Sequence, residues 1–394
     1  MDSITTADSL FFATMPSAAQ YDSLSGSALG RGIDRYAAGD YSGAAGEFRR
    51  TIALSPFSDN ALKAFEYLAN ALVKNGKTSE AIKTYKQAIR VFPSADGMNL
   101  SLGNLLYSEG LYTEAVEQYK AAVRKNPNLS QNIYSLGQGY LAMDLNADAE
   151  VEFKRAVQLS PKDSGGYYAL GQTYRKMGRF AEAQQELTRA LSIDKDSAEA
   201  HFELGMVYAE LQQADEAGSE LDILSKQSSP LYTELLAKIY ETSEPRIIAA
   251  YSAGLNLAAP AGTKLSAIDH SLTAPGASKN YTLTFVFDKQ MDAASVRNTG
   301  NWSIGRSTGT RTGGLYNWGI KVPETEVRIS SIPARVTYDP DSLTAKVTFS
   351  ITQNNAGDGT IDLSHLVFKF MGSDDYGNTM DTAANEYNKI SKIV

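Results

Sequence analysis

Two groups of side chains in this sequence could do chemistry: three histidines and a carboxylate-rich segment near the C-terminal end. His201, His270 and His365 are far apart, and none has the spacing of a metal-binding motif such as H-E-x-x-H. His365 borders a predicted strand, so we expect it at the surface. Nucleophile elbows, phosphate loops and dinucleotide fingerprints are also missing from the sequence. The sequence therefore predicts a protein that is not an enzyme.

The carboxylate-rich segment surrounds a Gly-Asn turn and contains Asp374, Asp375, Asn378 and Asp381. Carboxylate and amide oxygens are ligands that calcium prefers, so one interpretation is a calcium site. The spacing differs from that of an EF-hand loop, and Asp and Asn are also ordinary turn formers. We favour a plain turn, expect no cofactor, and keep calcium as the alternative that a calorimetric titration would test.

The composition excludes several classes of function. The 394 residues include 37 Lys and Arg, 45 Asp and Glu and no cysteine, which gives a net charge of −8. This acidic balance argues against general nucleic-acid binding and against docking on anionic membranes, because both need basic surfaces. Disulfides, thiolate zinc sites and cysteine nucleophiles are excluded. No apolar run is long enough to predict a membrane span.

A fixed interval of 34 residues organises the first half of the chain. The recurring residues are Leu102, Gly103 and Ala115, each with counterparts of the same type 34, 68 and 102 residues later. A period of this length is typical of a stacked repeat array, in which each repeat is one supersecondary unit. The sequence therefore predicts an all-α solenoid in this half.

The segment 130–163 shows how one repeat should fold. Ile133, Leu136, Gly137 and Tyr140 fall at i, i+3, i+4 and i+7, which is one face of a helix. Gly137 should lie where a second, antiparallel helix approaches closely, so that no side chain fits there. Pro161 should end that second helix, because proline lacks the amide hydrogen that would continue it.

These recurring residues resemble those of the tetratricopeptide repeat family, which implies six units of two helices each. The units are 25–58, 62–95, 96–129, 130–163, 164–197 and 198–231, and an amphipathic helix at 231–240 caps them. The resemblance implies a right-handed superhelix whose concave groove binds a peptide or helix of another protein. His201 falls on a helix-packing position of the sixth unit, and we expect it to be a buried structural residue.

The resemblance also assigns the residues that line the groove. Side-chain amides follow the Leu-Gly position of four consecutive units, at Asn70, Asn104, Gln138 and Gln172. Further groove positions are Tyr107, Tyr134, Tyr168, Arg175 and Phe202. A ladder of amides offers paired donors and acceptors to an extended peptide backbone, although the same residues could simply be solvated. The basic set of a carboxylate clamp is incomplete, and Glu66 and Glu203 are expected to oppose an acidic ligand.

The residue pattern changes at 242–245. Polar and apolar residues alternate in 281–287, 325–329, 345–351 and 366–370, which predicts strands separated by Gly, Asn, Pro and Asp turns. Several short strands over this length favour a β-sandwich. The phrases at 287–296 (FDKQMDAASV) and 301–304 (NWSI) resemble those of bacterial immunoglobulin-like modules. The predicted domains are a flexible tail (1–24), the tetratricopeptide solenoid (25–243) and an immunoglobulin-like β-sandwich (244–394).

Function and location follow as expectations. We expect a non-enzymatic scaffold for protein–protein interaction that binds a peptide segment or helix in the concave groove. The alternative is a structural or adhesive component of a bacterial surface or appendage assembly, with the β-sandwich as the main contact. The first residues lack the pattern of a cleaved signal peptide. We therefore expect a cytoplasmic protein or one exported to the cell surface by another route, for which the tail could be an uncleaved signal.

Overall fold

The computed structural model describes residues 17–252, 254–309 and 314–387. Contacts divide the chain into two compact units, Met1–Val207 and Tyr208–Val394, and each is described by itself. The greater part of the expected N-terminal tail, residues 1–16, lies outside the described residues. None of the helices in the described ranges is both long and apolar enough to cross a membrane.

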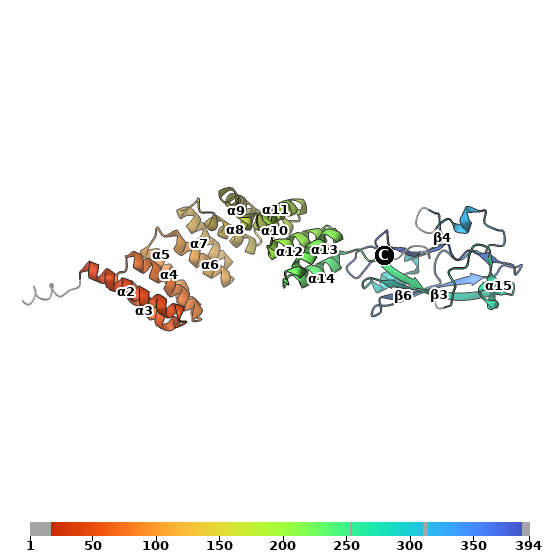
Figure 1. Ribbon diagram of the computed structural model, residues 1–394, viewed down its shortest axis with the longest axis horizontal. Helices are drawn as coiled ribbons and strands as arrows, with labels where there is room; N and C mark the ends of the chain where they lie inside the picture. Colours follow the sequence, from red (N-terminus) through yellow and green to blue (C-terminus); the bar gives the residue numbers. More distant parts are fainter. Residues whose placement is uncertain (1–16, 253, 310–313, 388–394) are drawn as a thin grey trace, which may run out of the picture. The chain divides into compact units, whose positions relative to one another are not determined.

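Helices fill the chain from Ala18 to Thr242 (Figure 1). Within the described residues they are α2 (Ala18–Ala37), α3 (Tyr41–Leu54), α4 (Asp59–Lys74), α5 (Thr78–Val91), α6 (Asp96–Ser108), α7 (Tyr112–Lys125), α8 (Ser130–Ala142), α9 (Asn146–Leu159), α10 (Ser164–Lys176), α11 (Phe180–Ile193), α12 (Ala198–Glu210), α13 (Ala214–Lys226) and α14 (Tyr232–Thr242). Their boundaries follow the 34-residue period, with one short and one slightly longer linker per repeat.

The first helix begins earlier than the sequence indicated. Ser17 is the N-cap of α2, its side chain accepts from the Gln20 backbone amide, and the Gln20 side chain accepts from the Ser17 amide. This reciprocal capping box satisfies two amides that a helix start otherwise leaves without partners. Residues 18–24, which were expected in a flexible tail, are therefore helical.

Close packing within each helix pair depends on glycine, as predicted. A Cβ atom on Gly137 of α8 would lie 2.7 Å from the ring of Phe153 on α9. One on Gly103 of α6 would lie 2.5 Å from the ring of Tyr119 on α7. Both distances are too short for a real contact, so the recurring glycine sets how closely the two helices approach.

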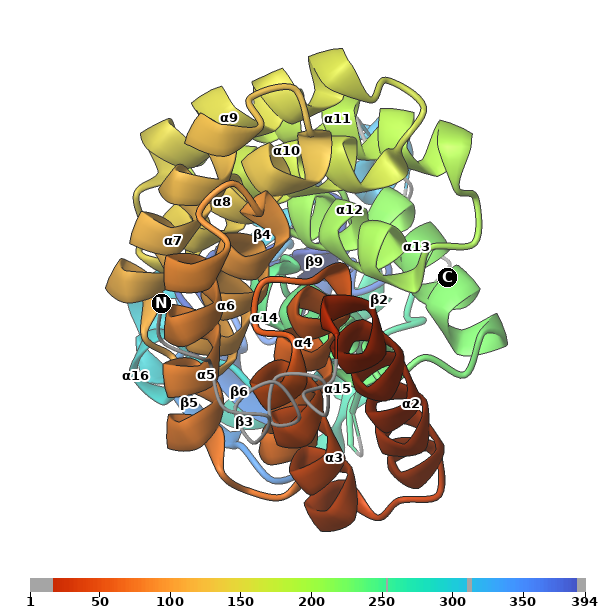
Figure 2. The same cartoon turned by 90° about the vertical axis from the view of Figure 1, so that its left-hand side faces the viewer.

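The helices of the first unit curve, and the curve has two distinct sides. Figure 2 shows α4, α6, α8 and α10 on its inner side and α5, α7, α9 and α11 on its outer side. The first helix of each of these pairs therefore lies on the inner side of the curve.

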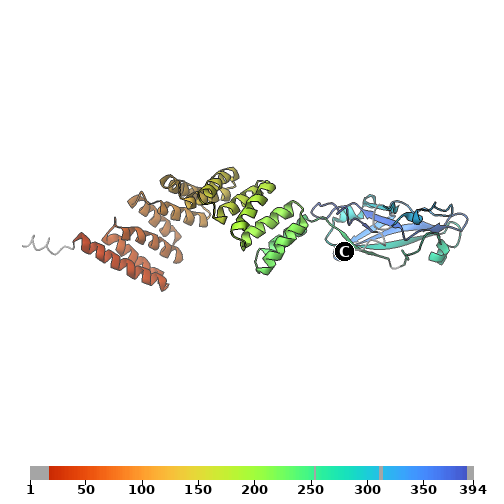
Figure 3. The same ribbon diagram turned by 45° about the horizontal axis from the view of Figure 1, so that its top comes forward.

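The second unit contains α13, α14 and a β region, which Figure 3 shows from a second direction. The strands are β1 (Ile247–Tyr251), β2 (Thr263–Lys264), β3 (Ser278–Phe287), β4 (Trp302–Arg306), β5 (Arg335–Asp339), β6 (Thr344–Thr352), β7 (Thr360–Ile361), β8 (Leu366–Phe370) and β9 (Glu386–Tyr387). They form three antiparallel sheets in the orders β1-β3-β6-β5, β2-β7 and β4-β8-β9.

Aromatic side chains join the two larger sheets. Phe285 and Phe287 point to the buried face of β3, and their rings lie 5.1 Å from Trp302 of β4 and 5.5 Å from Phe370 of β8. Phe349 of β6 lies 5.3 Å from Phe368 of β8. The alternation predicted in the sequence therefore places a continuous aromatic core between the sheets.

One predicted strand is wrong. Residues 325–329 form only an isolated bridge between Glu326 and Thr360, with hydrogen bonds at Thr325 and Val327. Pro323 and Pro333 flank the segment, and proline cannot donate to a ladder of backbone hydrogen bonds. The segment buries the side chain of Val327, which explains the alternation of residues, but it does not form a regular strand.

Candidate functional site

The four predicted amides lie on the inner helices and all are accessible. Asn70 on α4 and Asn104 on α6 are exposed, and Gln138 on α8 and Gln172 on α10 are partly exposed. Each follows the small residue that packs against the second helix of its repeat. A side chain at this position must therefore point away from the second helix of its repeat.

Tyrosines from the outer helices hold the two asparagines in place. The hydroxyl of Tyr85 donates to Asn70 Oδ1 at 3.1 Å, and that of Tyr119 donates to Asn104 Oδ1 at 2.9 Å. Because the oxygen of each amide accepts from a tyrosine, the Nδ2 group of each asparagine is left to donate. The structure thus fixes the orientation of two rungs of the ladder.

The two glutamines are held differently. Gln138 Nε2 donates to the hydroxyl of Tyr134 at 3.0 Å, so its carbonyl oxygen is left to accept. Gln172 Nε2 donates to Glu203 Oε1 at 2.9 Å and lies 3.5 Å from the Tyr168 hydroxyl. The positions that carry tyrosine in the asparagine repeats are Phe153 and Leu187 here, which have no hydroxyl to offer.

Glu203 of α12 is at the centre of a polar network at this end of the groove. Its carboxylate accepts from Gln172 and, through Oε2, from Arg175 Nε at 2.6 Å. Arg175 therefore offsets the negative charge of Glu203. Burial, followed by the charge of Glu203, raises the pKa of Tyr168 to about 12.

The remaining predicted groove residues differ in accessibility. Tyr107 is partly exposed and stacks edge-on against Tyr112 at 5.2 Å. Phe202 is buried and contributes to packing rather than to an open surface. His201 is buried as expected, and its Nε2 lies 2.9 Å from the carbonyl oxygen of Lys195.

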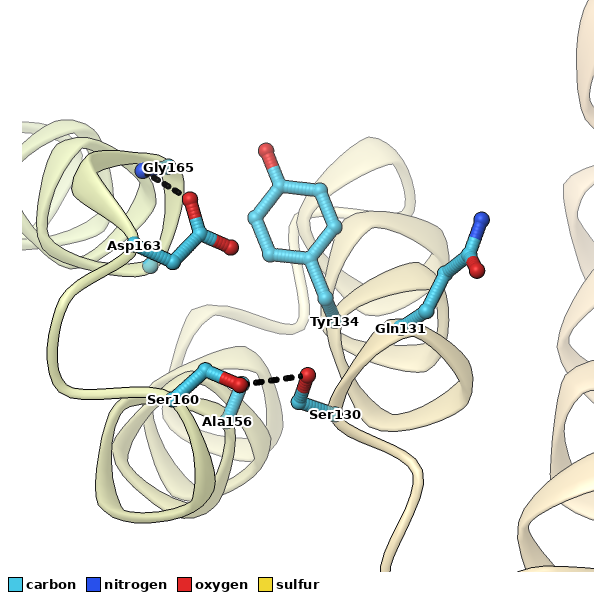
Figure 4. Close-up of a pocket in the computed structure, with 8 residues that line it drawn as sticks. Ser130, Gln131, Tyr134, Ala156, Ser160, Asp163 and Gly165 are labelled. Carbon is cyan, nitrogen blue, oxygen red and sulfur yellow. Dashed lines mark hydrogen bonds between the residues drawn. The ribbon is translucent and has the colours of Figure 1, made fainter.

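A pocket of about 400 Å³ opens between α8, α9 and α10 (Figure 4). Tyr134 projects from α8 toward the side of Asp163, with Gln131 on the other side of its ring. Ser160 donates to Ser130 at 2.8 Å at the edge of the pocket. Burial raises the pKa of Tyr134, and the charge of Asp163 adds to the effect. The sequence analysis named Tyr134 but not the pocket.

In the expected carboxylate cluster near residue 375, other groups of the protein bind the carboxylates of Asp374 and Asp381. Asp374 is buried, and its Oδ2 lies 2.6 Å from the ammonium of Lys289 and 2.9 Å from Asn378 Nδ2. Its Oδ1 accepts from the backbone amides of Tyr376 and Asn378. Asp381 accepts from Arg246 at 2.8 Å. Among the described residues no group of three acidic or histidine side chains could hold a metal ion. The calcium alternative stays untested.

His365 is not at the surface, contrary to expectation. It is fully buried, its Nδ1 lies 2.7 Å from Asp362 Oδ2, and the ring of Trp318 covers it edge-on at 4.7 Å. Asp362 also accepts from the amide of Asn317 and from Ser364. The alternation of β8 does not extend back to His365, so the strand pattern could not show this burial.

The orienting tyrosines are the functional residues that the sequence analysis missed. A signal for them exists, because Asn70 and Tyr85 are 15 residues apart and the same pair recurs one repeat later at Asn104 and Tyr119. The polar network around Glu203 had no such signal, since it occurs in one repeat only.

Comparison with known proteins agrees with this architecture. Residues 68–130, 152–185 and 174–239 match the tetratricopeptide repeat family. No curated protein sequence matches the chain. The helical region is therefore an array of tetratricopeptide repeats. Such repeats imply a scaffold for protein–protein interaction, a class that is typically non-enzymatic.

Solved structures similar to this chain include PilF of Pseudomonas aeruginosa. The two sequences are 19% identical, the match covers 55% of this chain and 99% of that chain, and the TM-score is 0.46. A tetratricopeptide repeat protein from Parabacteroides merdae is similar at 16% identity, 55% and 86% coverage and a TM-score of 0.49. YrrB, described as having an unusual peptide-binding site, is similar at 21% identity, 48% and 97% coverage and a TM-score of 0.40.

Proposed function

We propose that this protein binds an extended segment of a partner protein along the inner face of α4, α6, α8 and α10. The observation that carries the proposal is the ladder of accessible amides at a fixed interval. Two of them present donors, because tyrosine hydroxyls hold their oxygens, and Gln138 presents an acceptor. Backbone amides and carbonyls of an extended chain are complementary to such a ladder.

The chemistry of this recognition is hydrogen bonding on a pre-oriented surface. The asparagine side chains lose little freedom when a partner binds, because the hydroxyls of Tyr85 and Tyr119 already fix them. Partly exposed Tyr134 and Tyr168 stand next to the ladder and supply the aromatic area that commonly anchors interfaces. Backbone contacts give affinity without reading sequence, and neighbouring pockets supply the selectivity.

The test is capture of partner proteins from a bacterial lysate by the immobilised whole chain. The Asn104→Ala, Gln138→Ala double variant should lose most of the captured partner while keeping its helical circular dichroism. The matched control is Gln87→Ala with Gln158→Ala, which removes two exposed amides from the outer helices α5 and α9. Equal capture by the double variant and by the control would reject the groove.

A second function rests on the β region. We infer an immunoglobulin-like sandwich, supported by the aromatic contacts between its two larger sheets and by the resemblance of 287–304. Its loop at 315–320 exposes apolar side chains, with Trp318 65% and Ile320 70% accessible. Exposed aromatic residues of this kind mark interaction sites. In this reading the β region makes the main contact in a bacterial surface or appendage assembly.

The same capture experiment distinguishes the two proposed functions. Replacing Trp318 and Ile320 by Ser in the whole chain should abolish capture if the β region is the main contact. The same replacement should leave capture unchanged if the amide ladder is the main contact. Whichever pair of substitutions removes the partner identifies the surface that binds it.

A further inference from the structure

The pocket between α8, α9 and α10 has a single ionised lining group. Asp163 Oδ1 accepts from the Gly165 amide at 3.0 Å, which makes this residue the N-cap of α10. Its second oxygen has no hydrogen-bond or ion-pair partner in the part of the chain that the structure describes. Figure 4 shows this carboxylate beside the ring of Tyr134, and both residues line the pocket. An exposed carboxylate next to an aromatic ring is a site that favours a cation.

Two residues without a side chain, Gly165 and Gly166, are among those that line the pocket. Residue 165 is glycine, whereas the corresponding residues one repeat earlier and one repeat later are Gln131 and Glu199. A Cβ on Gly165 would meet only Asp163 Oδ1, at 3.3 Å, so packing does not require glycine there. Gly166 is different, because its Cβ would lie 2.8 Å from Val157 Cγ2. Gly165 lowers helix propensity and leaves the pocket open.

The charges that line this end of the groove are negative. The carboxylates of Asp163, Glu199 and Glu203 lie near it, and Arg175 forms an ion pair with Glu203. Glu203 and Glu199 both contribute to the raised pKa of Tyr168, which shows that they share its surroundings. The local balance of these four side chains is therefore −2.

The geometry points to a pocket that takes a lysine or arginine side chain of the bound segment. The cationic head would pair with Asp163 against the ring of Tyr134, and the methylenes would fill the space that Gly165 leaves. This inference rests on the proposed groove and names the class of partner it selects, an extended segment with a basic residue. An anionic group is disfavoured, although two helices begin here, because the Asp163 carboxylate already accepts from the first turn of α10.

The experiment selects displayed random peptides on the whole chain. Selected peptides are synthesised with acetyl and amide ends, so that only side chains carry charge, and their affinities are measured by calorimetry. The variants are Asp163→Asn, which keeps an N-cap and removes the charge, and Gly165→Gln, which installs the residue of the preceding repeat. The matched control is Asp194→Asn, the same change in the next inter-repeat loop, where Asp194 Oδ1 also accepts from a backbone amide, that of Asp196 at 3.3 Å.

We expect a Lys or Arg at one fixed position of the selected peptides. Its replacement by norleucine or citrulline should weaken binding to the wild-type chain by about tenfold or more. The same replacement should have little effect on Asp163→Asn, whereas Asp194→Asn should behave as wild type. Gly165→Gln should lose affinity for the basic peptide.

Two results would overturn this inference in different ways. Peptides that lack a basic residue, or that bind Asp163→Asn unchanged, yet lose affinity for the Asn104→Ala, Gln138→Ala variant would reject the basic pocket and keep the groove. Failure to select any peptide that depends on either set of residues would reject both.

Discussion

Single residues decide how each repeat packs and what it presents. A small residue at the closest approach of the two helices (glycine in three repeats, Ala69 in the fourth) lets the next side chain point outward, and that side chain is an amide in all four. The glycines, the helix pairs and the buried His201 could be predicted from spacing. The hydrogen bonds from Tyr85 and Tyr119 could not, because spacing alone does not show which outer-helix hydroxyl reaches the inner face.

Gly137→Ala should destabilise the array. The added methyl would lie 2.7 Å from the ring of Phe153, which is buried and has no room to move, so the cost should be about 1–3 kcal/mol. Gly46→Ala in α3 is the matched control, because its Cβ meets nothing within 4 Å, and it should stabilise by about 0.5–1 kcal/mol. Thermal unfolding followed by far-UV circular dichroism measures both, and equal midpoints would contradict the packing argument.

The stability of the array should fall at high pH through Tyr85. Burial, with a smaller effect of the Glu66 charge, raises the pKa of Tyr85 to about 12. An unfolded tyrosine titrates near 10, so the folded state binds this proton more tightly. The stabilisation is complete below pH ~10 and is lost between pH ~10 and ~12, at about 1.4 kcal/mol per pH unit for one proton.

Urea unfolding at pH 9 and pH 11 measures this loss. Tyr85→Phe should start less stable, because Asn70 loses its partner, but its midpoint should fall less between the two pH values. Parallel losses in wild type and variant would show that Tyr85 does not contribute. Burial also raises the pKa of Tyr168 to about 12, so this residue accounts for part of the fall in stability with pH that remains in Tyr85→Phe.

At the level of elements, α14 is tied to the β region by a buried lysine. Lys289 is 1% exposed, and its ammonium donates to the carbonyl oxygens of Tyr240 at 2.5 Å and Ser243 at 2.9 Å. It also pairs with Asp374 at 2.6 Å, between the rings of Tyr240 and Tyr376. A cation at the C-terminal end of a helix satisfies carbonyls that the helix leaves open.

Lys289→Met should therefore destabilise the second unit by about 3–5 kcal/mol, because it leaves the buried Asp374 carboxylate without its cation. Adding Asp374→Asn should recover part of the loss. Lys346→Met, at an exposed lysine of β6, is the control and should have little effect. Tryptophan fluorescence during thermal unfolding reports the β region, and similar midpoints for the two methionine variants would count against the interaction.

The elements also show where sequence patterns fail. Three of the four predicted strands lie within β3, β6 and β8, because each buries alternate residues along a continuous ladder. The segment 325–329 has the same alternation and makes one bridge. The early start of α2 depends on the Ser17 and Gln20 side chains, and His365 is buried by Trp318 and Asp362, which come from elsewhere in the chain.

At the scale of the whole molecule, the two units should unfold separately. Repeat arrays are stabilised by contacts between neighbours, whereas the β region has its own aromatic core. Both tryptophans, Trp302 and Trp318, lie in the β region, and Trp302 is buried. Urea curves recorded by fluorescence and by circular dichroism at the helix band should therefore differ in midpoint. Superimposable curves would contradict this independence.

The buried Lys289 has a consequence for how this polypeptide can be divided. A fragment that begins at Glu244, where the residue pattern changes, would carry the lysine without the two carbonyl oxygens that accept its hydrogen bonds. A fragment that begins at Tyr208 would keep all three acceptors. Any exchange of this β region between chains would therefore have to bring α14 with it if these contacts are to be kept.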